Sequence, residues 1–205
     1  MIHLSEADYM GRGATRRCFI HPLDFELCIK IDDEPSSTVT LKEAAAYGKV
    51  KKRLAKCNFR YDVIPKFHGM VKTSYGDGGV YDLIGNETDG EVATTLSELL
   101  MQKLSDQEIR NIKLALKEFT EKVVKYWIIS SDMRSHNLCV KKLSGGGYRI
   151  VCIDGLGHRD KLPLCDVLFF WARMKIKRHI RRYHLDDFEK LLIHGAGLKP
   201  AIKDL

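Results

Sequence analysis

The sequence predicts an α+β protein with a strand-rich first part that carries one helix and a mostly helical second part. Three observations support this. Short β-branched runs alternate with glycine-bearing turns up to residue 84. Helix formers interrupt them at residues 39–55, and from residue 95 onward apolar residues recur at helical spacing. We therefore expect a β-rich first lobe at residues 1–84 and a helical second lobe at 85–205, with a polar connector at 85–93.

The first lobe is expected to open with a short strand at residues 2–4, followed by a glycine-bearing turn at 10–15 and a strand at 17–20. The chain then turns at Pro22 into a β-branched strand at 27–31. After the helix at 39–55, strands are expected at 66–72 and 79–84, and the glycine-rich stretch 75–79 between them predicts a hairpin.

The second lobe is expected to start with a short helix at residues 95–103. Ser105 and Glu108 then form a capping-box pattern that predicts the start of a longer helix. The apolar stripe of that helix is Ile109, Ile112, Leu116, Phe119, Val123 and Tyr126. Two short strands are expected at 138–140 and 148–153 around the glycine turn 144–147, and the chain is expected to be helical from about residue 163.

Composition limits the protein classes. The 205 residues are 44% hydrophobic and 30% charged, which is typical of an ordered domain. No apolar run is long enough to span a membrane and no secretory signal is visible, so we expect a cytoplasmic protein. The six cysteines include no C-x-x-C pair, which favours reduced thiols and gives no zinc motif. The net charge of +7 favours anionic partners, but many ordinary cytosolic proteins are as basic.

Two acidic stretches carry the candidate chemistry. Asp132 and Asn137 lie five residues apart in a polar loop, and Asp154 follows an apolar run just before Gly155. Oxygen donors of this kind suit Mg²⁺. The spacing D-x-x-x-x-N equals that of a kinase catalytic loop, and Asp154-Gly155 keeps two of the three positions of D-F-G. Either pattern alone also occurs by chance, and an Asp after a strand often only begins a turn.

The remaining parts of a phosphotransferase site lie upstream in the expected order. Lys30 interrupts an apolar strand and can contact phosphates, with Glu43 in the following helix to hold it. Gly11 and Gly13 can let the backbone approach phosphates, although hairpin turns use glycine as well. A strand lysine otherwise simply points to solvent. Together the motifs predict a protein-kinase-like two-lobed fold.

In this hypothesis Asp132 accepts the proton of the acceptor hydroxyl and Arg134 steadies the transferring phosphoryl group. Asn137 and Asp154 hold magnesium. The adenine of ATP meets the backbone near Asp82 to Ile84, under an apolar ceiling from residues such as Ile29.

The chain resembles the bacterial YrbL family, a small protein-kinase-like family named for the PhoP regulatory network. The resemblance runs over roughly residues 4–192 and rests on the stretches 11–22, 27–30, 132–137 and 153–155. It implies a kinase-like fold that binds ATP, and it leaves the phosphoacceptor, a small molecule or a protein, open.

The sequence departs from ordinary kinases at several positions. Arg16 stands at the third glycine of the loop, Ser130 and Ser131 stand before the catalytic Asp, and Gly155 replaces the D-F-G phenylalanine. Only residues 156–162 precede the next expected helix, with no A-P-E element. These departures argue against peptide docking and activation-loop control, but they remove no group that the chemistry needs. An active phosphotransferase and an ATP-binding pseudokinase or regulatory module therefore both stay open.

The last part of the chain carries a basic helix. An apolar stripe of Phe169, Ala172, Ile176, Ile180 and Tyr183 is expected to face the core, with the basic residues of 173–182 on the other sides. These charges form either a solvated face or a docking surface for an anionic partner. A third class of function, a nucleic-acid or membrane binder in which the acids are structural, rests on this helix.

Overall fold

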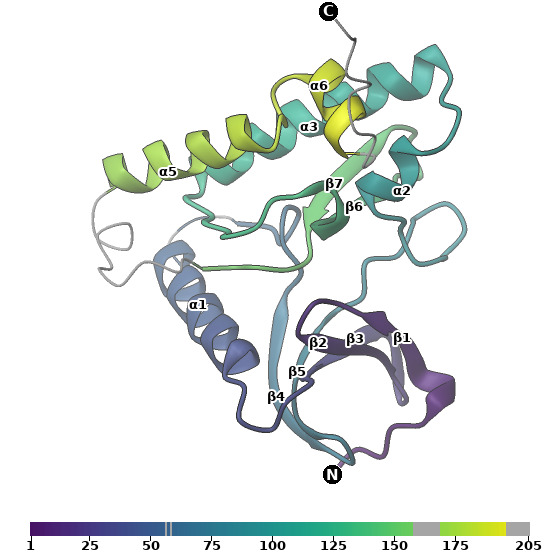
Figure 1. Ribbon diagram of the computed structural model, residues 1–205, viewed down its shortest axis with the longest axis vertical. Helices are drawn as coiled ribbons and strands as arrows, with labels where there is room; N and C mark the ends of the chain where they lie inside the picture. Colours follow the sequence, from purple (N-terminus) through teal and green to yellow (C-terminus); the bar gives the residue numbers. More distant parts are fainter. Residues whose placement is uncertain (56, 58, 158–168, 196–205) are drawn as a thin grey trace, which may run out of the picture. The chain divides into compact units, whose positions relative to one another are not determined.

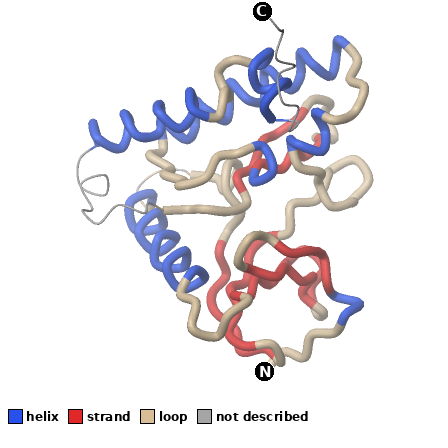
Figure 2. The backbone as a smooth tube through the Cα atoms, viewed as in Figure 1, coloured by secondary structure: helices blue, strands red, loops and turns tan. Residues whose placement is uncertain are grey.

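The computed structural model describes all residues except 56, 58, 158–168 and 196–205. The chain divides into two compact units, the first formed by Met1–Tyr61 and Pro65–Gly85 and the second by Asp62–Ile64 and Asn86–Leu205 (Figure 1). A β-rich sheet and several helices confirm the predicted α+β class (Figure 2).

The first unit contains an antiparallel sheet of five strands in the order β1-β2-β3-β5-β4. A short 3-10 helix η1 (Glu6–Asp8) precedes the sheet. Its strands are β1 (Tyr9–Arg12), β2 (Arg16–His21), β3 (Asp24–Asp32), β4 (Phe67–Thr73) and β5 (Gly76–Asp82). Two turns are tighter than expected. Strand β1 continues through Gly11 and leaves only residues 13–15 for the first turn, and β5 begins at Gly76, whose φ is +117°.

Alternation along β3 gives the sheet two different faces. Ile29 and Ile31 lie in a buried cluster with Leu4, Phe19 and Val80. Lys30 lies on the opposite face because successive side chains of a strand alternate. Helix α1 (Val39–Leu54) contacts this second face through Glu43. The carboxylate of Asp32 caps the first turn of α1, since it accepts hydrogen bonds from the backbone N–H and the hydroxyl of Thr40.

The second unit begins its helical part with α2 (Leu96–Leu100) and α3 (Asp106–Lys125). The capping box predicted for α3 is confirmed: the Ser105 hydroxyl accepts from the Glu108 N–H at 3.3 Å, and the Glu108 carboxylate accepts from the Ser105 N–H at 2.8 Å. Most of the predicted stripe is buried as expected, with Ile112, Leu116, Phe119 and Val123 in the core, joined by Ala115.

A two-stranded antiparallel hairpin lies beside these helices. It consists of β6 (Leu138–Lys142) and β7 (Tyr148–Cys152), which confirms the predicted strand pair. A short 3-10 helix, η2 (Ser135–Asn137), leads into β6. Residues Asp62–Ile64 belong to this unit, because the Cys152 N–H donates to the Val63 carbonyl at 2.9 Å and Asp62 pairs with Lys122 at 2.7 Å. No pattern in the sequence predicted that assignment.

Helices α5 (Phe169–Arg182) and α6 (Phe188–Gly195) complete the described part of the second unit. The expected inner stripe is right for Ala172, Ile176 and Ile180, which are buried, but wrong for Phe169, which is 48% exposed. Lys175 is expected among the outward-facing basic residues, but it is buried. The buried face of α5 is wider than its apolar stripe and includes polar side chains. Residues 158–162, Cys165 and the expected start of the helix near residue 164 lie outside the described residues.

None of the described helices combines the length and apolar character needed to cross a membrane. No disulfide joins the described cysteines, which are residues 18, 28, 57, 139 and 152.

Candidate functional site

In the first unit, Lys30 and Glu43 belong to one buried polar group. Lys30 is 8% exposed, Glu43 5% and Arg16 4%. Nη1 of Arg16 lies 2.6 Å from Oε2 of Glu43, and the Tyr81 hydroxyl donates to the same oxygen at 2.9 Å. Nζ of Lys30 lies 5.1 Å from the centre of the Tyr81 ring, within range of a cation–π contact. The structure therefore brings the two predicted residues together around Tyr81, and adds Arg16.

The backbone of β5 shapes this group at Gly79. A Cβ atom at position 79 would lie 2.8 Å from Cε2 of Tyr81, 2.9 Å from its hydroxyl and 3.1 Å from Cγ2 of Thr40 on α1. Glycine here lets α1 approach the sheet and lets the Tyr81 ring fold back along the strand toward Glu43. Burial, and next the charge of Glu43, raises the pKa of Tyr81, so its hydroxyl stays protonated and donates.

The other predicted residues of the first unit lie elsewhere in the sheet. Gly11 pairs with Cys18 inside β1, and the N–H of Gly13 donates to the Arg16 carbonyl in the turn that follows. The Asp82 carboxylate contacts His68 at 2.6 Å and accepts from the Lys66 N–H, while Ile84 follows β5 and is half-buried. Their predicted contacts with a nucleotide stay predictions.

The structure corrects the expectation that Ile29 forms an apolar ceiling over adenine. Ile29 is completely buried in the apolar cluster, on the face of β3 opposite Lys30. The apolar residue that shares the Lys30 face is Cys28, two positions earlier on the strand. The pattern identified a strand with a lysine in it, but not which face the core would cover.

In the second unit, main-chain contacts bring the Asp132 loop and the Asp154 segment together. The Ser131 N–H donates to the Gly155 carbonyl at 2.8 Å, and the Gly157 N–H donates to the Ile129 carbonyl at 2.8 Å. Gly155 has a φ of +75°, and a Cβ atom there would lie 3.2 Å from Cβ of Asp132. Glycine suits position 155 because its φ is positive and a side chain there would press against Ser130 and Asp132.

Asp132 is held by Arg134. Nε of Arg134 donates to Oδ1 of Asp132 at 2.8 Å, Nη2 donates to Oδ2, and the Arg134 N–H donates to Oδ1 at 3.2 Å. Burial of Asp132 raises its pKa, and the hydrogen bonds and charge of Arg134 outweigh that effect, so the pKa lies below its ordinary value. The carboxylate is ionised at neutral pH.

Asn137 and Asp154 offer the oxygen donors predicted for magnesium. Nδ2 of Asn137 donates to the Asp132 carbonyl at 3.4 Å, which turns its Oδ1 atom away from that contact. The Ile153 N–H donates to the Asn137 carbonyl at 2.9 Å, which joins the backbone next to Asp154 to the same loop. Oδ1 of Asp154 accepts from the Gly155 N–H at 2.6 Å.

This donor set fits a magnesium ion that takes few protein ligands. Within the described ranges, no group of three or more His, Cys, Asp or Glu side chains is arranged to hold a metal ion. Magnesium is commonly bound by one or two carboxylates together with phosphate oxygens and water. One carboxylate from Asp154 and one amide oxygen from Asn137 agree with that coordination, whereas a structural metal ion bound by protein ligands alone would need more of them.

Sequence reasoning missed two contributions. In the sequence, Arg16 stands out only because it replaces the third glycine of the loop, yet it is the buried partner of Glu43, and its spacing from Glu43 carries no local signal. Ser130 stands out only because it replaces a histidine. Its hydroxyl lies 3.1 Å from the Asp132 N–H, which donates to it, and 3.4 Å from the Asp154 carbonyl, so it joins the two acidic segments.

Comparison with known proteins gives one consistent result. The family model described as PhoP regulatory network protein YrbL matches residues 2–186. The protein YrbL of Escherichia coli (strain K12) is 29% identical over 167 residues, covering 80% of this chain and 77% of that relative. YrbL of Shigella flexneri matches with the same identity and coverage. Since the family model spans nearly all of the sequence, this chain belongs to the family of PhoP regulatory network protein YrbL.

Proposed function

We propose that this chain is a minimal kinase-like phosphotransferase that moves the γ-phosphoryl group of ATP to a hydroxyl acceptor. The observation that carries the proposal is the pairing of the Asp132 loop with the Asp154 segment. It puts an ionised carboxylate, an amide oxygen and a second carboxylate on two segments joined by main-chain hydrogen bonds. Phosphoryl transfer needs such positioned groups more than it needs covalent chemistry.

The buried group of the first unit supports the same proposal. Lys30 and Arg16 bring two cations to it and Glu43 brings one carboxylate. We assign Lys30 to the phosphates of ATP, with Glu43 as the group that positions it. Arg16 and Tyr81 fix the Glu43 carboxylate, so its position is set by the fold of the unit itself.

The roles in the second unit follow from its contacts. Asp132 accepts the proton of the acceptor hydroxyl, for which its ionised state is required. Arg134 holds this carboxylate, and we assign it to the transferring phosphoryl group as the cation nearest to Asp132 along the loop. Magnesium held by Asn137 and Asp154 would neutralise charge on the phosphates.

A second candidate is an ATP-binding regulatory module without transfer activity. The contacts of Arg134 favour it, since they engage both carboxylate oxygens of Asp132. A base in this state can accept a substrate proton only after Arg134 releases one of those oxygens.

Two measurements separate these functions. Thermal unfolding with Mg-ATP should show a higher Tm than without it, and Asp154→Ala should abolish the rise. Asp89→Ala, an exposed acid of the same unit, is the matched control. If millimolar Mg-ATP leaves the Tm of the unaltered protein unchanged, both candidates are wrong.

Transfer is then measured with γ-labelled ATP and a cell extract whose own kinases have been heat-inactivated. A phosphotransferase labels an acceptor, Asp132→Ala does not, and Asp89→Ala does. Equal labelling by the unaltered protein and Asp132→Ala would refute the role of Asp132. A Tm rise without labelling of any molecule would support the regulatory module.

A further inference from the structure

A groove of about 670 Å³ lies between helices α3 and α5 of the second unit, and neither Asp132 nor Asp154 is among the residues that line it. The two helices run alongside each other (Figure 1). Val124 of α3 and Phe169 and Ile180 of α5 supply apolar lining. The Phe169 ring also packs edge-on against Trp127 at 5.6 Å, so this side of the groove is built from contacts within the unit.

Basic side chains dominate the rims of the groove. Arg173, Lys177 and Arg181 line it from α5, and Lys125 lines it from α3. The α5 residues recur every four positions and so stand one above another on the helix. None of these three forms an ion pair with another described residue, whereas Lys113 and Lys122 of α3 are both paired.

Without a ligand, repulsion between these three side chains lowers the stability of helix α5. Like charges at a spacing of four on a helix repel one another and destabilise it. Helix α5 has no acidic residue to offset its charges. An anionic group in the groove would remove the repulsion, which points to an acidic ligand.

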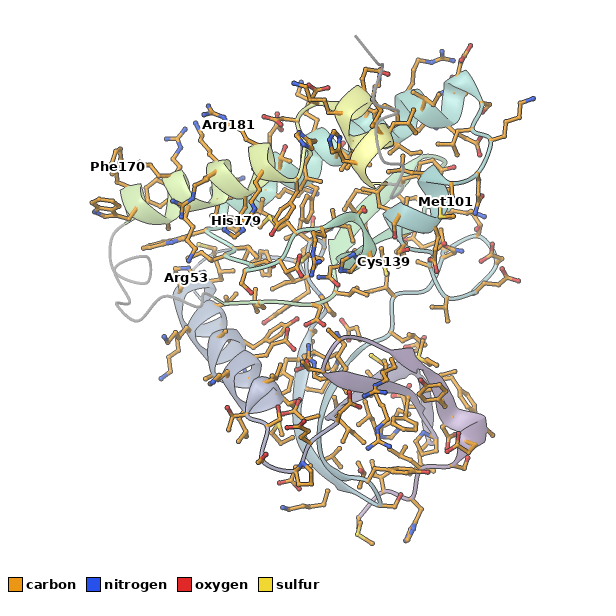
Figure 3. All side chains as sticks on the ribbon, in the orientation of Figure 1. Arg53, Met101, Cys139, Phe170, His179 and Arg181 are labelled. Carbon is orange, nitrogen blue, oxygen red and sulfur yellow. The ribbon has the colours of Figure 1, made fainter. Side chains whose placement is uncertain are left out.

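Large apolar side chains outside the groove lining are also exposed at the start of α5. Phe170 is 68% exposed, Met174 50% and Trp171 49%. In Figure 3, Phe170 and Arg181 extend outward from α5. Exposed clusters of large apolar side chains are characteristic of interaction surfaces, and aromatic residues with Arg are enriched where proteins bind proteins.

We propose that this groove binds a segment of a partner protein in which acidic side chains stand beside apolar ones. The apolar lining from Val124, Phe169 and Ile180 fits the apolar side chains, and the three basic side chains that line the groove from α5 fit the acidic ones. Two carboxylates, Glu121 and Asp186, also line the groove. Because of them the groove carries charges of both signs, which fits the spaced charges of a polypeptide better than the uniform charge of a nucleic acid or an anionic membrane. A concave surface between two helices also fits a chain better than a flat bilayer.

The test uses short fluorescein-labelled peptides with glutamate and leucine arranged at strand spacing or at helical spacing. Binding to the full chain is followed by fluorescence anisotropy. We expect micromolar affinity for at least one arrangement, a loss when leucine is replaced by serine, and weaker binding at high salt. Lys177→Glu with Arg181→Glu should weaken binding by about tenfold or more.

The matched control is Arg178→Glu with Arg182→Glu, which makes the same charge change at exposed positions of α5 outside the groove. It should change the affinity by less than about threefold. Equal loss in both double variants, or no binding of any peptide up to about 1 mM, would overturn the proposal. A third outcome would overturn it as well: no peptide binds, the protein binds phosphatidylserine vesicles or duplex DNA, and Lys177→Glu with Arg181→Glu weakens that binding. None of these outcomes depends on ATP binding or phosphoryl transfer.

Discussion

Arg16→Met removes the guanidinium from the buried ion pair that Arg16 forms with Glu43 in the first unit. The Arg16 and Glu43 side chains are each only 5% exposed, and the two charged atoms lie 2.6 Å apart. Removing one partner of a buried pair costs about 3–5 kcal/mol, because the remaining charge stays in a poorly solvated site. The Tyr81 hydroxyl still donates to Glu43 in this variant. We therefore expect the lower end of that range, about 3 kcal/mol.

The assay is urea unfolding followed by far-UV circular dichroism. Arg12→Met serves as the control, because Arg12 forms an ion pair of similar length with Asp33, at 3.0 Å, but its own side chain is 63% exposed. An exposed pair contributes about 0–1 kcal/mol. The two substitutions thus make the same chemical change on neighbouring strands and differ in burial.

A double variant sharpens the test. In Arg16→Met the Glu43 carboxylate stays buried without the guanidinium of Arg16, and Glu43→Gln removes that charge. The double variant should therefore lose less stability than the sum of the losses in the two single variants. If Arg16→Met costs no more than Arg12→Met, or if the two losses at Arg16 and Glu43 simply add, the buried pair does not stabilise the unit in the way described.

Three further outcomes are expected. Gly155→Ala should lower stability by about 1–3 kcal/mol, because its φ is +75° and the new Cβ would lie 3.2 Å from the Ser130 hydroxyl; an unchanged Tm would contradict this. Arg134→Ala should raise the pKa of Asp132, measured by carbon-detected NMR titration. In the unaltered protein, the stability from that pairing is present above the unfolded-state pKa of Asp132 and is lost as the pH falls through its lower folded pKa. Ser105→Ala should cost about 1 kcal/mol in urea unfolding, and no loss would argue against the cap on α3.

Local patterns predicted the elements of the fold well. The capping box at Ser105, the stripe on α3 and the hairpin of β6 and β7 each depend on residues close together in the sequence. Turn positions were less accurate, as at Gly76, because glycine is tolerated both in a turn and at the start of a strand.

Burial was harder to predict where it depends on distant pairing. Alternation along β3 gives two faces but does not say which one the core covers, so the expectation that Ile29 forms a ceiling over adenine is wrong. The charge of Lys175 predicts an exposed side chain, but its position on α5 puts it on the buried face of the helix.

In the candidate site too, local patterns are informative and the pairing of distant segments is not. Spacing makes Asp132, Asn137 and Asp154 candidates, and order along the chain does the same for Lys30 and Glu43; their roles stay predictions. The spacing of the acids gave no information on the main-chain bonds between residues 129–131 and 155–157, because strand-like pairing of two irregular segments has no composition of its own.

Those main-chain bonds also determine when the segments lose their conformational freedom. Ordering the backbone costs about 1–2 kcal/mol of entropy per residue. Here the loss is complete once the second unit has folded, so a ligand that contacts both Asp132 and Asp154 does not have to order the loop again. Calorimetry of such a ligand should therefore show a small entropic penalty, with affinity limited by contacts and desolvation.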